Sequence, residues 1–498
     1  MSDMETLQVQ SGRGSNPILA KNTVSISEAE RGRLSTLAHR LLRDEPALSS
    51  TEAFGDNVSA GLFQAPAVLI GDHSEIPLAD QTGTSVLGYR ISHLAEQGDL
   101  LILNSERSPA FEAYRDRYLG LGQLDVLVLP SGNDAAETSI ARRCVEQADV
   151  FQIIKDLAQR ERRLNIIPHI GTGSVWRLGA AIAANNDIEI KICAPPPRLT
   201  KRVNDKLWFT QQVSEILGSE ALPLTFSAFG PEALAHEVSL LSRRWPNVVI
   251  KVPDSAGSAG NVRLNSDEIK TLDVDRLRSQ LLEWLRSLGW HDRYPIMVEV
   301  WDHPIVSSPS VQVWVPEREQ GMPIVEGVFE QVVAGLEGKF IGAVPAALPN
   351  SWEERLANDA TRIAYLFQQL GYFGRCSFDA VIAGEDYATG ELHWIECNGR
   401  WGGVSVPMTL MVRLIGDWSK HPFVIVQREN MNIPPRDFAE VLKLLEGQLY
   451  KHGRDKRGVV LLTPGAVERG SGVHFLSLGD TLDEAKATAM NVIEILSE

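Results

Sequence analysis

The stretch HWIECNGRWGG (393–403) sets polar groups at every second position of an otherwise apolar run. Glu396, Asn398 and Arg400 supply a carboxylate, an amide and a guanidinium, and a glycine pair follows them. Side chains alternate between the two faces of a strand, so Glu396 and Asn398 are expected on one face. A carboxylate and an amide oxygen bind hard cations, whereas a guanidinium binds carboxylates and phosphates.

The residues before this stretch predict its partner strand. The segment GEDYATGE (384–391) is typical of a turn, and a hairpin with Glu385 opposite Gly390 sets Asp379 opposite Glu396. The same register pairs Val381 with Trp394 and Ala383 with Leu392. Two facing carboxylates repel each other unless a cation compensates them. We therefore predict that Asp379, Glu396 and Asn398 hold Mg²⁺, with phosphate oxygens completing its octahedron.

A Glu-x-Asn triplet alone is explained as well by the solvated face of an ordinary antiparallel strand. The combination is more specific than the triplet. Asp379 is aligned with it, and Arg400 and a glycine pair follow it.

A lysine followed by small residues is a second candidate. VVIKVPDSAGSAGNV (248–262) places Lys251 at the end of an apolar strand, before Ser255, Gly257, Ser258 and Gly260. Glycines let backbone N–H groups approach phosphate oxygens, and the lysine adds a positive charge. We predict a phosphate-binding flap; a plain hairpin loop is the alternative. The pattern GxxxxGK[ST] of a P-loop is absent from the sequence.

Two further segments fit nucleotide binding. Lys206 opens a predicted helix that Asn204 or Asp205 caps, and is either a second phosphate ligand or ordinary helix surface. In PIMVEVWDHP (295–304), Glu299 and Trp301 end an apolar strand. An adenine can pair with backbone groups there and stack on the indole. An interior strand with one polar position is the alternative.

Composition limits the class of protein. The chain has 498 residues, enough for several domains, and a net charge of −16, which disfavours binding to nucleic acid or anionic membranes. No apolar run approaches the roughly 18 residues of a membrane-spanning helix. The four cysteines lack CxxC spacing, which fits a reducing compartment. These features predict a soluble, cytoplasmic protein.

The pattern changes along the chain. Residues 65–200 alternate short apolar runs with amphipathic stretches, which is typical of a parallel sheet covered by helices, and APPPRL (194–199) ends this part. The following segment, up to about residue 420, mixes antiparallel strands with segregated helices, and residues 421–498 have strands and a final helix of their own. An α/β part followed by α+β parts is therefore expected.

Taken in order, these segments resemble the ATP-grasp superfamily. Its signature is a lysine at a helix start, a strand lysine with a flap, a hinge glutamate, an acidic strand residue and Glu-x-Asn-x-Arg, matched here by Lys206, Lys251, Glu299, Asp379, Glu396, Asn398 and Arg400. LGYRISHLAEQGDLLILNSERSPAFEAYRDRYLGLG (87–122) resembles the pre-ATP-grasp domain of the pheganomycin-type peptide ligases. FEQVVAGLEGKFIGAVPAALP (329–349) and WGGVSVPMTL (401–410) are also similar to that subgroup.

The resemblance implies a multidomain fold. Its expected parts are a partly disordered N-terminal extension (1–60), a Rossmann-like pre-ATP-grasp domain (61–200), a two-lobed ATP-grasp domain (201–420) and a small C-terminal α+β domain (421–498). The small lobe of the ATP-grasp domain is expected at about 201–298 and the large lobe at about 299–420.

The resemblance also implies the activity, an ATP-dependent joining of a carboxylate to an amine through an acyl phosphate, with amino acids or peptides as substrates. ATP and Mg²⁺, with Mn²⁺ as a substitute, are the implied cofactors, and a homodimer is the implied assembly. Lys206 and Lys251 would hold the phosphates under the flap of Ser255, Gly257 and Ser258. Glu299 and Trp301 would receive the adenine, and Arg400, with Lys251, would act in catalysis.

Three other functions stay open: a carboxylase that uses bicarbonate, a kinase-like phosphoryl transfer, and an ATP-binding regulatory protein without turnover. The sequence also departs from relatives at two points. No acidic residue follows Asp302 in HPIVSSPSVQVW (303–314), so the ribose contact is unassigned. Ser377 stands where some amino-acid ligases carry an arginine, and the role of Arg375, two residues further back, is open.

Overall fold

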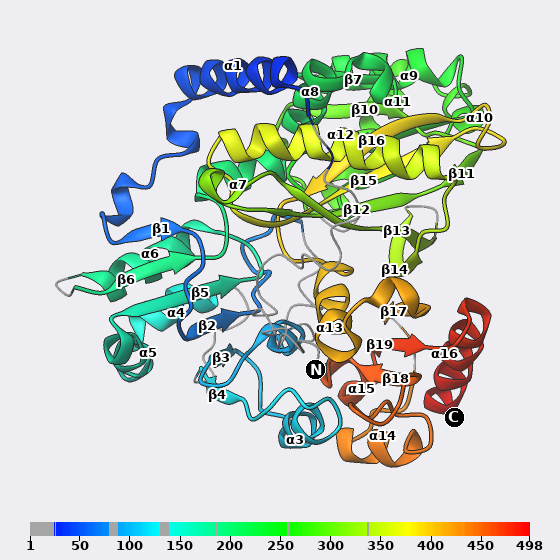
Figure 1. The fold of residues 1–498 in the computed structure, drawn as a ribbon. Helices are drawn as coiled ribbons and strands as arrows, with labels where there is room; N and C mark the ends of the chain where they lie inside the picture. Colours follow the sequence, from blue (N-terminus) through cyan, green and yellow to red (C-terminus); the bar gives the residue numbers. More distant parts are fainter. Residues whose placement is uncertain are drawn as a thin grey trace.

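The structure, a computed structural model, describes residues 24, 26–78, 88–129, 139–184, 187–255, 259–335, 338–429, 431 and 433–498. Three sheets organise them (Figure 1): a parallel sheet A, a small antiparallel sheet B and a long antiparallel sheet C. Within these residues, no helix is both long enough and apolar enough to cross a membrane.

The helix α1 (Glu28–Asp44) precedes the three sheets, where the periodicity of residues 26–45 predicts a helix. The Ser27 hydroxyl caps it by accepting a hydrogen bond from the Glu30 amide at 3.2 Å. The buried side chains of α1 belong to a core shared with α12 (Asn350–Gln369), and the two helices lie along the same side of the molecule in Figure 1. Residues 1–23 of the expected N-terminal extension lie outside the described residues.

Sheet A has six parallel strands in the order β1-β6-β5-β2-β3-β4. They are β1 (Val58–Ala60), β2 (Ala67–Ile70), β3 (Leu100–Leu103), β4 (Asp125–Val128), β5 (Arg163–Pro168) and β6 (Glu189–Ile192). The helices of this part are η2 (Pro46–Leu48), η3 (Glu52–Phe54), η5 (Arg90–Leu94), α3 (Pro109–Arg117), α4 (Ile140–Glu146), α5 (Ala148–Glu161) and α6 (Gly173–Ala183). Strands β2 and β3 are buried along their whole length, as expected of a parallel sheet covered on both faces, so the predicted α/β part is confirmed.

Sheet B forms the core of the expected small lobe. Helices α7 (Pro197–Val203) and α8 (Lys206–Leu217) and the short η6 (Ser219–Ala221) lead into it. Its order is β7-β10-β8-β9, all antiparallel, with β7 (Thr225–Ala228), β8 (Asn247–Lys251), β9 (Asn261–Asn265) and β10 (Ile296–Val300). Helices α9 (Pro231–Ser242), α10 (Ser266–Ile269) and α11 (Val274–Ser287) belong to the same lobe.

Sheet C runs from the expected large lobe into the C-terminal segment. Its order is β11-β15-β12-β13-β14-β17-β19-β18, with β16 paired to β15. The strands are β11 (Ile305–Ser307), β12 (Pro309–Val315), β13 (Ile324–Ala334), β14 (Lys339–Pro345), β15 (Gly374–Ala383), β16 (Glu391–Asn398), β17 (Phe423–Glu429), β18 (Gly458–Leu461) and β19 (Gly472–Leu478). Besides α12, its helices are η7 (Arg318–Gln320), α13 (Ser405–Ile415), η8 (Trp418–Lys420), α14 (Phe438–Leu444), α15 (Gly465–Glu468) and α16 (Leu482–Ser497). Because β17 pairs with β14, the C-terminal strands extend the sheet of the large lobe.

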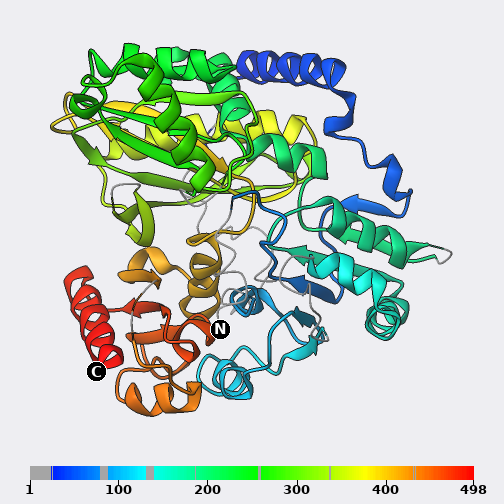
Figure 2. The ribbon, with the colours of Figure 1, turned by 180° about the vertical axis from the view of Figure 1, so that it is seen from behind.

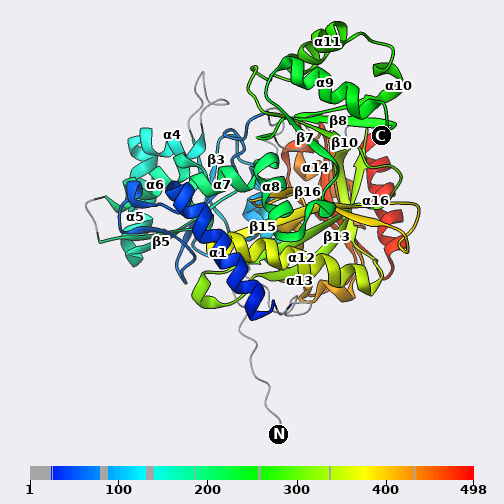
Figure 3. The same ribbon diagram turned by 90° about the horizontal axis from the view of Figure 1, so that it is seen from above.

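Hydrophobic packing divides the molecule differently from the sheets. One buried cluster joins side chains of sheet A and η5 to α13 and to the C-terminal strands. Figures 1 and 2 both show α13 between sheet A on one side and β17–β19 on the other. Sheet B has a separate cluster formed with α9 and α11, and the view from above shows this lobe projecting from the rest (Figure 3). Sheet B with α9 and α11 is therefore a packing unit of its own, whereas α7 and α8 pack with α12, β15 and β16.

Candidate functional site

The hairpin β15–β16 brings the predicted carboxylates together. Asp379 pairs with Glu396 and Ser377 pairs with Asn398, as the sequence predicts for the open end of the hairpin. Above Asp379 the predicted register is wrong, because Ala380 pairs with Trp394. There Val381 faces His393 in place of Trp394, and Ala383 faces Glu391 in place of Leu392.

A β-bulge explains this mixed result. The register shifts between Asp379 and Ala380, and Ile395 is the additional residue on β16. The bulge offsets a turn that is displaced by one residue from the predicted position, so Asp379 and Glu396 still meet. Bulges are frequent beside active sites, where they change the direction of a side chain.

The two carboxylates have opposite electrostatic surroundings. Burial and the neighbouring charge of Glu396 raise the pKa of Asp379 to about 7, although the Ser310 hydroxyl donates to it at 2.6 Å and the Asn398 amide at 2.9 Å. Burial also acts to raise the pKa of Glu396, but the Lys206 ammonium, 3.0 Å away, outweighs it and lowers that pKa. Among the described residues, Glu396 therefore has a directly paired cation and Asp379 has none, and the nearby charge of Arg400 lowers the pKa of Asp379 only in part.

Arg400 lies beside this pair and is held by two amides. Its Nη2 donates to Asn398 Oδ1 and its Nη1 to Asn204 Oδ1, both at 2.6 Å. Asn204 also accepts from the Gly399 amide at 3.0 Å, while Asp205 caps α8. A Cβ on Gly399 would lie 2.5 Å from Val203 Cγ2, so only glycine permits this close approach. Asn204, treated above only as a cap candidate, therefore positions the arginine.

Lys206 connects the two lobes. Its ammonium donates to the Ser255 carbonyl at 2.6 Å, reaches the Ser255 hydroxyl at 3.3 Å and pairs with Glu396. Its side chain is 3% exposed, so it is a buried cation and the surface alternative does not apply. Two residues of the predicted flap, Gly257 and Ser258, lie outside the described residues. Lys206 thus links the start of the flap on the small lobe to β16 on the large lobe.

A second buried ion pair lies within sheet B. Lys251 and Glu299 pair directly, and the Thr225 hydroxyl donates to the other oxygen of Glu299 at 3.2 Å. Lys251 is also among the positive charges that lower the pKa of Glu396, so the small-lobe pair faces the large-lobe carboxylates. The Trp301 indole lies under the guanidinium of Arg263 at 5.1 Å. The adenine contact of Glu299 and Trp301 stays a prediction.

The donor set fits a magnesium ion. In the described part of the chain no group of three or more His, Cys, Asp and Glu side chains could hold a metal. Asp379 and Glu396 are two facing carboxylates, and Asn398 lies beside them, with its amide nitrogen donating to Asp379 and its oxygen accepting from Arg400. Burial and Glu396 raise the pKa of Asp379, so a bound cation would favour its charged form. Two carboxylates with ligands from a nucleotide phosphate are the usual surroundings of Mg²⁺.

Arg375, whose role the sequence leaves open, has a structural role. Its guanidinium pairs with Glu326 at 2.5 Å, and both side chains are fully buried. It lies between the rings of Trp314 and Trp401, at 5.2 and 5.1 Å. Since Trp401 follows Arg400 directly, Arg375 supports the loop that carries Arg400.

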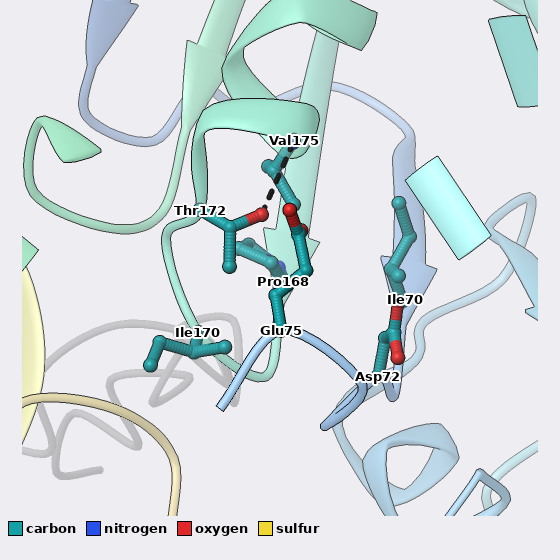
Figure 4. A pocket seen from close by; sticks show the side chains of 7 residues that line it. All are labelled: Ile70, Asp72, Glu75, Pro168, Ile170, Thr172 and Val175. Carbon is teal, nitrogen blue, oxygen red and sulfur yellow. Dashed lines mark hydrogen bonds between the residues drawn. The ribbon is translucent and has the colours of Figure 1, made fainter. Parts of the chain in front are cut away.

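A small hollow lies at the edge of sheet A (Figure 4), and hydrogen bonds engage the two carboxylates that line it. Ile70 and Pro168 end the adjacent strands β2 and β5 there, below the start of α6. Asp72 accepts from the Ile140 amide at 2.7 Å and from Ser74, and Glu75 accepts from the Ser174 hydroxyl at 2.8 Å. These carboxylates fix loops and helix starts, so the hollow is structural.

Comparisons with known proteins agree with this geometry. Residues 88–184 match the family described as the pre-ATP-grasp domain. No curated protein matches the chain. Among solved structures, similar folds are an N5-carboxyaminoimidazole ribonucleotide synthetase with ADP (14% identity, TM-score 0.51, covering 88% of this chain and 97% of that one) and the biotin carboxylase of Campylobacter jejuni (14%, 0.53, 87% and 92%). The N5-carboxyaminoimidazole synthase of Aspergillus clavatus is a third (13%, 0.51, 87% and 99%). Such low identities establish the fold alone.

Proposed function

We propose that this chain is an ATP-grasp enzyme, an ATP-dependent, ADP-forming carboxylate–amine ligase; the matched pre-ATP-grasp segment and the similar folds support this proposal. One observation carries the proposal. Two lysines, two facing carboxylates and one arginine converge between sheets B and C, from parts of the chain almost 200 residues apart. A protein that only bound ATP would have little need for the whole set.

Lys206 and Lys251 are the groups that would hold the nucleotide phosphates. Both are buried, and both are paired with carboxylates. Binding of an anionic triphosphate would redistribute these ion pairs, and Lys206 would then contact phosphate while keeping its position between the lobes. Because sheet B has its own core, Lys251 and the flap can move toward sheet C as one unit.

Asp379, Glu396 and Asn398 are the residues that would hold Mg²⁺. The ion, when bound, would neutralise charge on the β- and γ-phosphates. The chain's part is to keep the two carboxylates opposed and to hold Asn398 in place through Arg400. The Ser310 hydroxyl donates to one oxygen of Asp379 and thereby orients the carboxylate.

In the proposed reaction, a substrate carboxylate attacks the γ-phosphate, which forms an acyl phosphate and releases ADP. An amine then attacks the acyl carbon, and phosphate leaves as the amide bond forms. Arg400, fixed by Asn204 and Asn398, would stabilise the negative charge of the transferring phosphoryl group and of the tetrahedral intermediate. Positioning and electrostatics would provide most of the catalysis.

The finer prediction is that the substrates are amino acids or peptides. It is supported by the resemblance of residues 87–122 to the peptide-ligase subgroup, and these residues overlap the matched pre-ATP-grasp segment. The alternative is activation of bicarbonate. It is favoured by the names of the similar structures, which are carboxyaminoimidazole ribonucleotide synthetases and a biotin carboxylase.

Trapping with hydroxylamine tests the proposal. The purified protein is incubated with Mg-ATP, hydroxylamine and pools of amino acids and short peptides, and ADP is followed in parallel. Hydroxamate that depends on one pool is the expected result. ADP formation that requires bicarbonate and yields no hydroxamate would move the assignment to the carboxylase. Tight ATP binding without ADP from any pool would contradict both.

A further inference from the structure

Arg90 is a buried cation that the reaction described above does not use. It begins the short helix η5 in the pre-ATP-grasp domain and is 6% exposed. Its Nη1 donates to Gln427 Oε1 and its Nη2 to the Gly403 carbonyl, both at 2.6 Å, and its buried Nε has no partner. A guanidinium has five N–H donors, so most of those of Arg90 are unused. Both acceptors are neutral, so no anion balances the charge of Arg90 directly.

The position of Arg90 is fixed relative to Arg400. Arg413 of α13 donates to the carbonyls of His93 and Ala95, at 2.5 and 2.9 Å, and so holds the end of η5. Helix α13 begins directly after the loop of Arg400–Gly403, and the Gly403 carbonyl is the acceptor of Arg90. The contact with Arg90 therefore lies three positions after Arg400, and both ends of that contact are anchored.

Two neutral imidazoles lie close to Arg90 and Arg400. His73 and His169 stack at 3.7 Å between ring centroids, and His169 Nε2 has no partner. Burial, together with the charges of Arg400 and Arg90, lowers the pKa of both imidazoles, so both arginines lie close to this pair and the histidines are neutral.

On the other side, Glu429 is the one anion near Arg90 in the described contacts, and it is already compensated. Lys339 pairs with it at 3.0 Å, and Gln427 donates to it at 3.2 Å. His474, buried beside it, lies 3.8 Å away and has no hydrogen-bond partner. In the described part of the chain, Arg90 therefore has no directly bonded anion, and its Nε donor is unused.

We infer that Arg90 binds a carboxylate group of a substrate, in a subsite formed by η5, the loop of Arg400–Gly403 and β17. The inference rests on the proposed ligase function and specifies its substrate class as compounds with a free carboxylate. An anion is the ligand that both completes the donors of Arg90 and balances its charge, and a planar carboxylate matches the fork of a guanidinium. The carboxylate belongs either to the acid that is activated or to the amine substrate as a group that does not react.

Direct binding tests this subsite without turnover. The full-length protein with MgADP is examined by saturation-transfer NMR against the twenty amino acids and a set of dipeptides, and against the same compounds as C-terminal amides. Wild type is expected to bind at least one acid about 10- to 100-fold more tightly than its amide, as a lost charge-assisted bond implies. Arg90→Gln is expected to remove this preference and leave the amide's affinity unchanged.

Controls separate a binding role from a structural one. Arg142→Gln removes an equal charge from an exposed position of the same domain and is expected to bind the acid like wild type. Arg90→Lys keeps the charge and is expected to retain part of the preference. The inference is overturned if no compound binds, if acid and amide bind equally to wild type, or if Arg90→Gln keeps the preference while folded.

The same variants separate the two sources of the carboxylate and the two levels of the proposal. With hydroxylamine as the amine, loss of hydroxamate in Arg90→Gln assigns the contact to the activated acid. Retained hydroxamate, with a raised KM for the natural amine, assigns it to the amine substrate. If a carboxylate compound binds through Arg90 but no ADP forms, the subsite is supported and the ligase function is contradicted. If ADP forms but Arg90→Gln binds the acid as wild type does, the ligase function is supported and the subsite is contradicted.

Discussion

Two charge pairs face each other across the site: a buried pair of opposite charges in sheet B and a half-buried pair of like charges in sheet C. In sheet B, Lys251 and Glu299 are opposite charges in direct contact. In sheet C, Asp379 and Glu396 are like charges on adjacent strands, and the pKa of Asp379 is raised to about 7 by burial and by Glu396. The pair in sheet B is thus neutral as a unit, whereas in sheet C Lys206 pairs with Glu396 and no cation pairs directly with Asp379 in the described part of the chain.

The largest expected effect concerns the sheet B pair. Lys251→Met leaves Glu299 buried without its partner, so the free energy of unfolding should fall by about 3–5 kcal/mol. Urea unfolding measures this change. Lys270→Met, in an exposed pair of the same lobe, should cost less than about 1 kcal/mol. If Lys251→Met with Glu299→Leu is no more stable than Lys251→Met alone, the loss does not come from an unpaired carboxylate.

Arg400 provides the next effect, on rate. Removing one preorganised donor typically lowers turnover by about 10²–10³, and this loss is expected for Arg400→Ala. Nucleotide affinity should change little, because the lysines that would hold the phosphates are intact. Turnover is followed as ADP release and affinity by fluorescence titration. Unchanged turnover would remove Arg400 from the mechanism.

Asp379→Asn tests the missing charge in sheet C. The folded-state pKa of Asp379 is raised, so its contribution to stability is complete below the unfolded value near 4 and is lost as the pH rises through about 7. In EDTA at pH 8, Asp379→Asn should therefore be more stable than wild type, by on the order of 2 kcal/mol. At pH 4 the difference should disappear. Thermal unfolding at both pH values measures this difference. Equal midpoints at pH 8 would mean that burial and Glu396 do not disfavour the charged form of Asp379.

The smallest expected effect comes from Asn204, which holds Arg400 from a distance in sequence. Asn204→Ala removes one hydrogen bond to a charged group, worth about 1.5 kcal/mol, so turnover should fall about 10-fold. Asp205→Asn is the matched control, because asparagine also caps helices and turnover should be kept. An equal loss in both variants would indicate a general effect on α8.

How far the sequence predicts this site depends on how many residues separate the two partners of each contact along the chain. The pairing of Asp379 with Glu396 was predicted correctly although the turn was placed one residue away, because the bulge offsets that difference. The order of segments was sufficient for the ATP-grasp fold. The bulge at Ile395 was not predictable, since neither periodicity nor turn composition reports one additional residue. Asn204 and Arg90 were missed as site residues for another reason. Their partners lie 196 and 313 residues away, and only the folded chain brings them together.

The pairing of β17 with β14 is a similar case. The strand pattern of residues 421–498 indicates strands and a helix but not the sheet that they join. In the same way, the composition around Arg375 gives no sign that two tryptophans enclose it, and the resemblance leaves its role open.

The central claim is that this site activates a carboxylate by transferring phosphate to it. The most direct measurement uses the carboxylate substrate found by trapping, labelled with ¹⁸O in both oxygens, in a reaction with Mg-ATP and the amine. Formation of an acyl phosphate predicts that the released phosphate carries one ¹⁸O, seen as a shifted ³¹P resonance, and that Arg400→Ala forms it far more slowly. Phosphate without label, formed together with ADP, would mean that water or another acceptor attacks ATP, and would contradict the account.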